Sequence, residues 1–252
     1  MVEPVGAIWM LWLQGWQAAP EVARVARRSW ERQNPGIEVR ALDGNDWRQW
    51  VPTSDAERID RAPLPVVLSD LLRLELLHRH GGVWADATTL CAAPLADWLP
   101  DRLAHGFVAF ARPGPDRPLS NWFLAAPAGD PTVAELRARA IAHWRSRTEL
   151  DDYFWFHRCF AELLEEDAPL AARWEAARHP SSAPAIHRFH FAPGDPRLAA
   201  PPRQEDLDAL ASGEHPPVFK LTHKDIDGCG PGSLLAVLLE FGRGTAPGRT
   251  RD

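Results

Sequence analysis

The segment SDLLRLELLHRHGGVWADATTL, residues 69–90, limits the possible folds more than any other part of the chain. Its repeated leucines predict a helix that begins at Ser69 or in the preceding turn, and Gly81 and Gly82 predict the end of that helix. The apolar run that follows predicts a buried strand ending at Asp86. An ionised carboxylate is costly in such a place unless a partner stabilises it, so Asp86 is the first candidate for a functional residue.

Helix and strand patterns alternate through the first half of the chain. Residues 6–13 read as a buried strand, residues 20–33 as a helix with Pro20 in its first turn, and IEVRAL as a second strand, followed by short helical pieces over 44–61. This order predicts an α/β fold with a mostly parallel central sheet flanked by helices. In such sheets ligands bind at the carboxyl ends of the strands, which is where Asp86 lies.

The second half of the chain is less regular. GFVAFA and NWFLAA are typical of strands, residues 131–147 and 151–167 of helices, VFKLTHK of a short strand and SLLAVLLEF of a closing helix, with a proline-rich loop over 180–203. No internal repeat is present. We expect a single domain over residues 1–242 and a disordered tail over 243–252, because the tail has nothing to bury.

Composition narrows the class of protein. The formal net charge of -6 argues against a nucleic-acid-binding protein, which would present a basic face. The three cysteines, Cys91, Cys159 and Cys229, form no metal-ligand spacing and are expected to be free thiols. The apolar segment AIWMLWLQGW is too short to span a membrane and lacks the features of a signal peptide. We therefore expect a cytoplasmic protein without a transmembrane segment, with a peripheral position at the inner membrane face as an option.

Two further polar residues precede Asp86. Asp70 and Arg73 are three residues apart, so they share one face of the predicted helix. One interpretation is a polar site, with Asp86 on a divalent cation such as Mg²⁺ or Mn²⁺ and the other two on a polyhydroxylated or phosphorylated ligand. The other is a simple ion pair between Asp70 and Arg73, with Asp86 capping a turn. Spacing alone leaves both open.

The central block resembles the SDxxRxxxLxxxGGxWxDA pattern of the capsular polysaccharide synthesis proteins, relatives of the DxD-containing sugar transferases of glycosyltransferase family 32. The stretches IWMLWLQGW, SWERQNPGIEVRAL, NWFLAAPAGDP, DYFWFH and KLTHK extend the similarity over roughly residues 5–225. The resemblance implies a GT-A-like fold, a nucleotide-sugar donor, a glycan or lipid-linked acceptor, a divalent Mn²⁺ or Mg²⁺ and retention of configuration at the transferred sugar.

The resemblance also implies roles for individual residues. Asp86 matches the first carboxylate of the DxD motif, and Thr88 stands where the second carboxylate would be. Asp70 and Arg73 match positions that contact the donor sugar and would act in catalysis with Asp86. The resemblance also places Asp86 itself, Ala87 and Thr88 on the donor, together with Trp9 and Trp12. It places His223 on the metal with Asp86.

Two residues are weaker candidates for the acceptor site. His157, in DYFWFHRCF, is either a hydrogen-bonded core histidine or an acceptor contact, and Trp122 is either a core residue or a platform for a sugar ring. Three functions follow from the whole reading: a sugar transferase of surface or capsular polysaccharide synthesis, a nucleotide-sugar-binding partner subunit without turnover, and a transferase that glycosylates a protein side chain.

Overall fold

A computed structural model describes residues 5–245 of the chain. Its centre is a five-stranded sheet in the order β2-β1-β3-β6-β5, and a two-stranded sheet pairs β4 with β7. The strands of the large sheet are β1 (Ala7–Leu11), β2 (Glu38–Leu42), β3 (Gly82–Ala85), β5 (Val108–Gly114) and β6 (Arg117–Ala126), and those of the small sheet are β4 (Thr89–Cys91) and β7 (Val218–Lys220).

Four of the five strands in the large sheet run in one direction. β1 is parallel to β2 and to β3, whereas β6 is antiparallel to both β3 and β5. The prediction of a mostly parallel sheet is therefore confirmed, and β6 is the reversed strand. The carboxyl ends of β1 and β3 meet at one edge, where the chain continues into Trp12 and Asp86.

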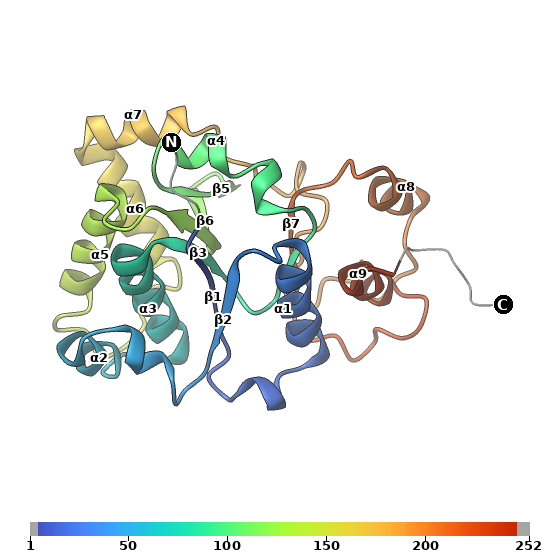
Figure 1. Cartoon of the computed structure of the whole chain (residues 1–252), viewed down its shortest axis with the longest axis horizontal. Coiled ribbons are helices and arrows are strands. Elements are labelled where there is room, and N and C mark those ends of the chain that lie inside the picture. Colours follow the sequence, from blue (N-terminus) through green and yellow to red (C-terminus); the bar gives the residue numbers. More distant parts are fainter. Residues whose placement is uncertain (1–4, 246–252) are drawn as a thin grey trace.

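Helices cover both faces of the large sheet (Figure 1). The α-helices are α1 (Glu21–Gln33), α2 (Thr53–Ile59), α3 (Pro65–His80), α4 (Pro100–Leu103), α5 (Pro131–His143), α6 (Trp155–Glu166), α7 (Ala168–Ala176), α8 (Gln204–Ser212) and α9 (Leu234–Arg243), and short 3-10 turns lie at Trp16–Ala18, Trp47–Trp50 and Leu95–Asp97. In Figure 1, α3, α5 and α6 lie on one side of the sheet and α1 on the other.

The side chains of β1 alternate between two hydrophobic cores, as the pleat of a strand requires. Trp9 and Leu11 pack into the core shared with α3, α5 and α6, whereas Ile8 and Met10 pack into the core that contains Trp30 of α1. All of these side chains are buried. A strand buried on both faces reads as a continuous apolar run, which is why the sequence showed no alternation there.

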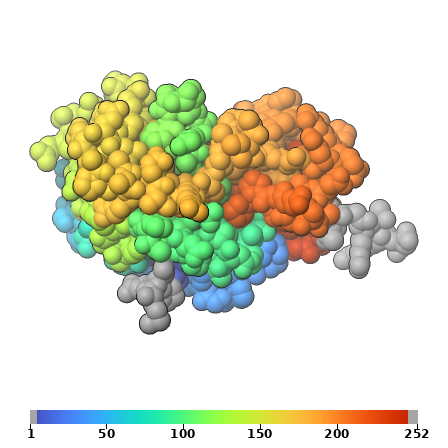
Figure 2. Space-filling model, turned by 90° about the horizontal axis from the view of Figure 1, so that it is seen from above, coloured from blue at the N-terminus to red at the C-terminus, as the bar shows by residue number. Residues whose placement is uncertain are grey.

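A third core joins the last part of the chain to the body. We call residues 187–245, with β7, α8 and α9, the C-terminal lobe. Its core contains side chains of α9 and β7 together with Val22 and Val25 of α1 and Leu90 of β4. The space-filling view shows the C-terminal residues, in orange and red, gathered at one end of the molecule (Figure 2). The lobe packs on the edge formed by α1 and β4.

The junction between α3 and β3 depends on two glycines. Gly81 and Gly82 have φ angles of 62° and 95°. A Cβ atom on Gly82 would lie 2.3 Å from the carbonyl oxygen of Ala7, and one on Gly81 would lie 2.5 Å from the backbone nitrogen of Ala128. Only glycine tolerates both the positive φ and the close approach, so this pair fixes where β3 enters the sheet.

α3 begins at Pro65, in the turn before Ser69, as the sequence prediction allowed, because the fixed φ of proline suits the first position of a helix. The proline-rich segment 180–203 contains no helix or named strand, as predicted. Of the predicted tail, Arg243 ends α9, and residues 246–252 lie outside the described residues.

Among the helices of residues 5–245, none combines the length and the apolar character needed to cross a membrane.

Candidate functional site

The third helix supplies a buried ion pair beneath the carboxyl edge of the sheet. The guanidinium of Arg73 lies 3.1 Å from an Asp70 carboxylate oxygen, and both side chains are only 4% exposed. Asn121 of β6 donates to the same carboxylate at 3.0 Å, while Arg73 donates to the Ser69 hydroxyl at 2.9 Å and to the Asn121 carbonyl. The pair predicted from spacing exists, but it lies inside the protein rather than on its surface.

The same arginine connects α3 to the end of β3. Arg73 lies 3.4 Å from Oδ1 of Asp86, whose side chain remains 27% exposed. The indole N–H of Trp84 donates to that oxygen at 3.0 Å, and the Arg73 guanidinium stacks over the Trp84 ring at 4.9 Å from its centroid. Asp86 itself is fixed by its backbone N–H, which donates to the Trp122 carbonyl at 2.9 Å. Asp70, Arg73 and Asp86 therefore form one polar cluster, in which the ion pair of Asp70 and Arg73 extends to Asp86.

A lysine from the C-terminal lobe completes this cluster. Lys220 Nζ donates to Oδ2 of Asp86 at 3.2 Å and to the hydroxyl of Thr88 at 2.9 Å. Thr88 is buried, so its hydroxyl is held toward the lysine. Both oxygens of Asp86 therefore have cationic or N–H partners, and the position of the missing second carboxylate is occupied by a neutral hydroxyl.

The surroundings of Asp70 and Asp86 shift the pKa values of these two carboxyl groups in opposite directions. Burial raises the pKa of Asp70 to about 6; the Asp86 charge adds to this rise, whereas Arg73 and Asn121 oppose it. Burial also acts to raise the pKa of Asp86, but Lys220 and Arg73 outweigh burial and hold that pKa below its usual value. Near neutral pH, two cations and two carboxylates nearly balance one another, and the balance changes as Asp70 titrates.

A cavity of about 430 Å³ opens above the cluster at the carboxyl edge of the sheet. Arg73, Asp86 and Lys220 form part of its polar floor, and Ala87 and Thr88 also line it. Its aromatic lining residues are Trp12, Trp84, Tyr153, Phe191 and His223. The cavity combines flat apolar walls with cationic groups, an arrangement suited to a ligand with rings and an anionic centre.

The structure separates the two tryptophans predicted to contact the donor. Trp12 follows the end of β1 and lines the cavity, with its ring 5.0 Å from that of His223 in an edge-on arrangement. Trp9 lies in the middle of β1, is fully buried, and donates to the Gly81 carbonyl at 3.0 Å. The predicted donor contact of Trp9 does not agree with this placement, because its buried side chain does not line the cavity.

Asp70 likewise lies behind the cavity wall. Its carboxylate is buried against Arg73 and Asn121 and is not among the groups that line the cavity. It therefore acts on the site through Arg73, and the predicted direct contact with a sugar does not follow from this geometry.

The two weak acceptor candidates belong to the cores. Trp122 is 5% exposed and packs on Phe110 with ring centroids 4.5 Å apart. His157 is 8% exposed, lies between Phe154 and Phe156, and has a pKa lowered to about 4 by burial. Neither lines the cavity, so the core interpretation of both residues is the one that the structure favours.

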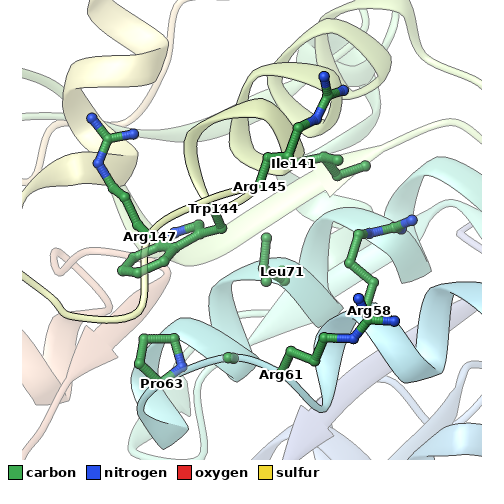
Figure 3. A pocket seen from close by; sticks show the side chains of 9 residues that line it. Arg58, Arg61, Pro63, Leu71, Ile141, Trp144, Arg145 and Arg147 are labelled. Carbon is green, nitrogen blue, oxygen red and sulfur yellow. The ribbon is translucent and has the colours of Figure 1, made fainter.

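A second cavity, of about 180 Å³, lies between α2, α3 and α5 and is lined by Arg58, Arg61, Arg145 and Arg147 around Trp144 (Figure 3). Arg58 is already paired with Asp55 at 2.6 Å, and the guanidinium groups of Arg145 and Arg147 point away from each other (Figure 3). No carboxylate lines this cavity, and its cations do not converge. The cavity above Asp86 is therefore the candidate site.

Comparisons with known proteins find relatives of this chain in sequence and in structure. The family model described as "Capsular polysaccharide synthesis protein" matches residues 2–227. The chain belongs to the capsular polysaccharide synthesis protein family. A protein of Saccharomyces cerevisiae named "Putative glycosyltransferase HOC1" is 23% identical over an alignment of 154 positions, and the match covers 53% of this chain and 38% of the yeast protein. The match thus spans less than half of that relative's length.

A solved structure shares the fold of this capsular polysaccharide synthesis protein. It is named "PaToxG Glycosyltransferase", and it superposes with a TM-score of 0.50 over 70% of this chain and 75% of its own, at 14% sequence identity. The expectation of a GT-A-like fold is confirmed at the level of architecture.

The residues of this capsular polysaccharide synthesis protein fit a protein-held metal ion poorly. Among residues 5–245, no three or more His, Cys, Asp or Glu side chains are grouped so that they could hold one. Lys220 and Arg73 already engage both oxygens of Asp86, and His223 packs on Trp12. A divalent ion on Asp86 would have to displace the Lys220 ammonium, because like charges about 4 Å apart repel by about 4 kcal/mol per pair of unit charges at an effective dielectric of 20.

Sequence reasoning missed three contributors to the site. Lys220 stands in the KLTHK stretch, and Asn121 stands in NWFLAA, but neither pattern shows what its side chain contacts. Tyr153, 69% exposed at the mouth of the cavity, is the only tyrosine of the chain. The signal that the sequence offered for Tyr153 was its place in DYFWFH, one of the stretches that extend the family resemblance.

Proposed function

We propose that this protein is a glycosyltransferase that moves a sugar from a nucleotide-sugar donor to a glycan or lipid-linked acceptor in surface or capsular polysaccharide synthesis, with retention of configuration, on the cytoplasmic side of the membrane. The observation that carries the proposal is the convergence of Arg73, Asp86 and Lys220 on one aromatic-walled cavity. Family membership and the glycosyltransferase name of the yeast relative support it.

The charges of the cavity suit a nucleotide-sugar. Such a donor carries an anionic diphosphate, which Arg73 and Lys220 would attract, while the aromatic residues offer surfaces for the base and the sugar. When the bond between the sugar and the diphosphate breaks, negative charge grows on the departing oxygen. Cations already in place stabilise that charge without rearranging during the reaction.

Asp86 would fix the positions of Arg73 and Lys220 relative to each other. Its Oδ1 faces Arg73 and its Oδ2 faces Lys220, so the carboxylate sets the distance between the two cations. Asp70 supports the arrangement from below by fixing Arg73. The resemblance also implies Mn²⁺ or Mg²⁺ on Asp86 and His223. Because the groups around Asp86 fit such an ion poorly, the proposed chemistry is not routed through a metal.

The test is a panel of nucleotide sugars examined by thermal shift and by release of nucleoside diphosphate. A ligand that binds the folded state raises the melting temperature, and turnover separates a transferase from a binding partner subunit. Replacing Asp86 with Asn should lower turnover at least about 100-fold, comparable to losing one group that stabilises transition-state charge.

The matched control is Asp116→Asn, which removes a carboxylate whose side chain is 70% exposed and which does not line this cavity. It should behave as the wild type. If no nucleotide sugar shifts the melting temperature, or if Asp86→Asn retains wild-type turnover with its preferred donor, the proposal is wrong.

A further inference from the structure

Lys220 occupies the place where a metal ion would be expected. The segment Asp86-Ala87-Thr88 follows β3, and the ammonium of Lys220 bridges its two polar side chains, at 3.2 Å from the Asp86 carboxylate and 2.9 Å from the Thr88 hydroxyl. These are the two positions that carry carboxylates in a DxD motif. The Lys220 ammonium therefore lies where a divalent metal ion would lie, but it carries a single positive charge.

The backbone of Lys220 is held from both sides. In β7 it pairs with Thr89 of β4. Its N–H donates to the Phe189 carbonyl at 3.0 Å, and its carbonyl accepts from the N–H of Phe191 at 2.9 Å. The next residue, Leu221, donates its N–H to the Thr88 carbonyl at 2.9 Å. A lysine anchored in this way can present its ammonium at a defined point, which a side chain on a mobile loop could not do.

The ammonium also retains capacity for a ligand. Lysine has three N–H donors, and two of those of Lys220 are used on Asp86 and Thr88. Within residues 5–245 no third acceptor is found for it, and its side chain, 19% exposed, lines the cavity. The remaining donor is therefore available to an anionic oxygen that enters from the cavity.

We infer that Lys220 is the cation that neutralises the diphosphate leaving group, in place of a protein-bound metal ion. This inference rests on the proposed transferase function. In the reaction, the bond between the anomeric carbon and the diphosphate oxygen breaks, and its electron pair leaves with that oxygen. The acceptor hydroxyl oxygen bonds to the anomeric carbon and its proton passes to the departing diphosphate. Lys220 stays protonated throughout and stabilises the new charge through its third N–H.

Thr88 supports the same role of Lys220. A carboxylate at position 88 would add a second negative charge beside the ammonium and would suit a divalent ion better than a monovalent one. The neutral hydroxyl instead accepts one hydrogen bond from Lys220 and leaves a single carboxylate to balance a single ammonium. Thr88 therefore matches the charge of lysine, as two carboxylates would match that of Mn²⁺.

The experiment measures binding of UDP and GDP, and of UMP and GMP, by titration calorimetry to the full chain treated with EDTA. The wild type should bind a diphosphate equally well with EDTA and with added Mn²⁺. Lys220→Met should lose at least about tenfold in affinity for the diphosphate, because a hydrogen bond to a charged group is lost, and much less for the monophosphate. Adding Mn²⁺ should restore part of the loss, because Met leaves Asp86 free to accept the ion.

Two further variants separate charge from fold. Lys220→Arg keeps the positive charge and should remain independent of metal. Arg173→Met removes an exposed charge on α7, away from the cavity, and should match the wild type; circular dichroism checks that each variant is folded. The inference is overturned if EDTA abolishes diphosphate binding by the wild type, or if Lys220→Met binds as the wild type does. If no nucleotide binds the wild type under any condition, the transferase proposal itself fails, and this inference fails with it.

Discussion

The buried carboxyl group of Asp70 should make the stability of the protein fall as the pH rises through 6. Its pKa is raised to about 6 in the native state, whereas an aspartate in an unfolded chain has a pKa of about 4. Between these two values the native state binds more protons than the unfolded state, so the free energy of unfolding decreases with increasing pH. The contribution is largest below about pH 4 and is lost above about pH 6.

The magnitude follows from the two pKa values. A difference of one pKa unit corresponds to about 1.4 kcal/mol, so the roughly two units between the unfolded and native pKa of Asp70 correspond to about 3 kcal/mol. Burial justifies this conversion, because the Asp70 side chain is only 4% exposed. The neighbouring Asp86 acts in the opposite sense: its lowered pKa stabilises the native state above about pH 4, so its effect changes in a more acidic range.

The variant Asp70→Asn isolates this effect, because asparagine imitates the protonated carboxyl group in size and cannot titrate. Urea unfolding of the wild type and the variant from pH 4.5 to pH 7.5, at constant ionic strength, gives the free energy of unfolding of each. The variant should gain stability relative to the wild type as the pH rises, by about 2 kcal/mol over this range, because the rest of the change of about 3 kcal/mol falls below pH 4.5. The difference between the two proteins cancels the titration of groups that do not interact with Asp70, and Asp86, which does interact with it, titrates in a more acidic range. A difference that stays constant with pH, or that falls as the pH rises, refutes the reasoning.

Two further outcomes are expected. Arg73→Met should destabilise the protein by about 3–5 kcal/mol because it leaves Asp70 buried without its cation; Arg27→Met, which removes one partner of an exposed pair with Glu31, should cost less than about 1 kcal/mol in the same denaturation assay, and equal costs would contradict the buried pair. His223→Ala should bind a nucleoside diphosphate equally well with EDTA and with Mn²⁺ in titration calorimetry, as the wild type should, because the imidazole packs on Trp12. A wild-type response to Mn²⁺ that this variant loses would return His223 to a metal site.

The sequence was sufficient to predict the central part of the site. The order of strand and helix patterns predicts the layered fold, and Gly81 and Gly82 predict where β3 begins, because their backbone angles leave few other residues possible. The position of Asp86 at the end of that strand then follows. The strand and helix patterns, the glycine pair and the strand-end aspartate are each set by residues close together in the chain. Their spacing can therefore be recognised in the sequence alone.

The remaining parts of the site depend on pairing between distant segments. Lys220 reaches Asp86 across 134 residues, through the ladder of β4 and β7, and the short β4 gave no strand signal of its own. Trp9 and Trp12 stand in the same apolar run, and only the position at which β1 ends, at Leu11, places one of them in the core and the other in the cavity. Boundaries of one or two residues are beyond the resolution of a hydropathy pattern, yet they decide which side chain meets a ligand.

Docking of the C-terminal lobe on the body brings Lys220 to Asp86, so a complete site exists only in molecules in which the lobe is docked. The lobe contacts the body through α9, where Arg243 pairs with Glu21 of α1 and where a Cβ atom on Gly242 would lie 2.5 Å from a Leu90 methyl carbon. Proteins open in local units whose free energies are smaller than that of global unfolding. If the lobe detaches in this way, Arg73 and Asp86 keep their places, while Lys220 departs together with the part of the cavity wall that includes Phe191 and His223. The opened molecule then lacks its second cation and part of its binding surface. The equilibrium of lobe docking therefore sets the fraction of molecules with a complete site, and residues at the α1–α9 contact would tune activity without touching any substrate.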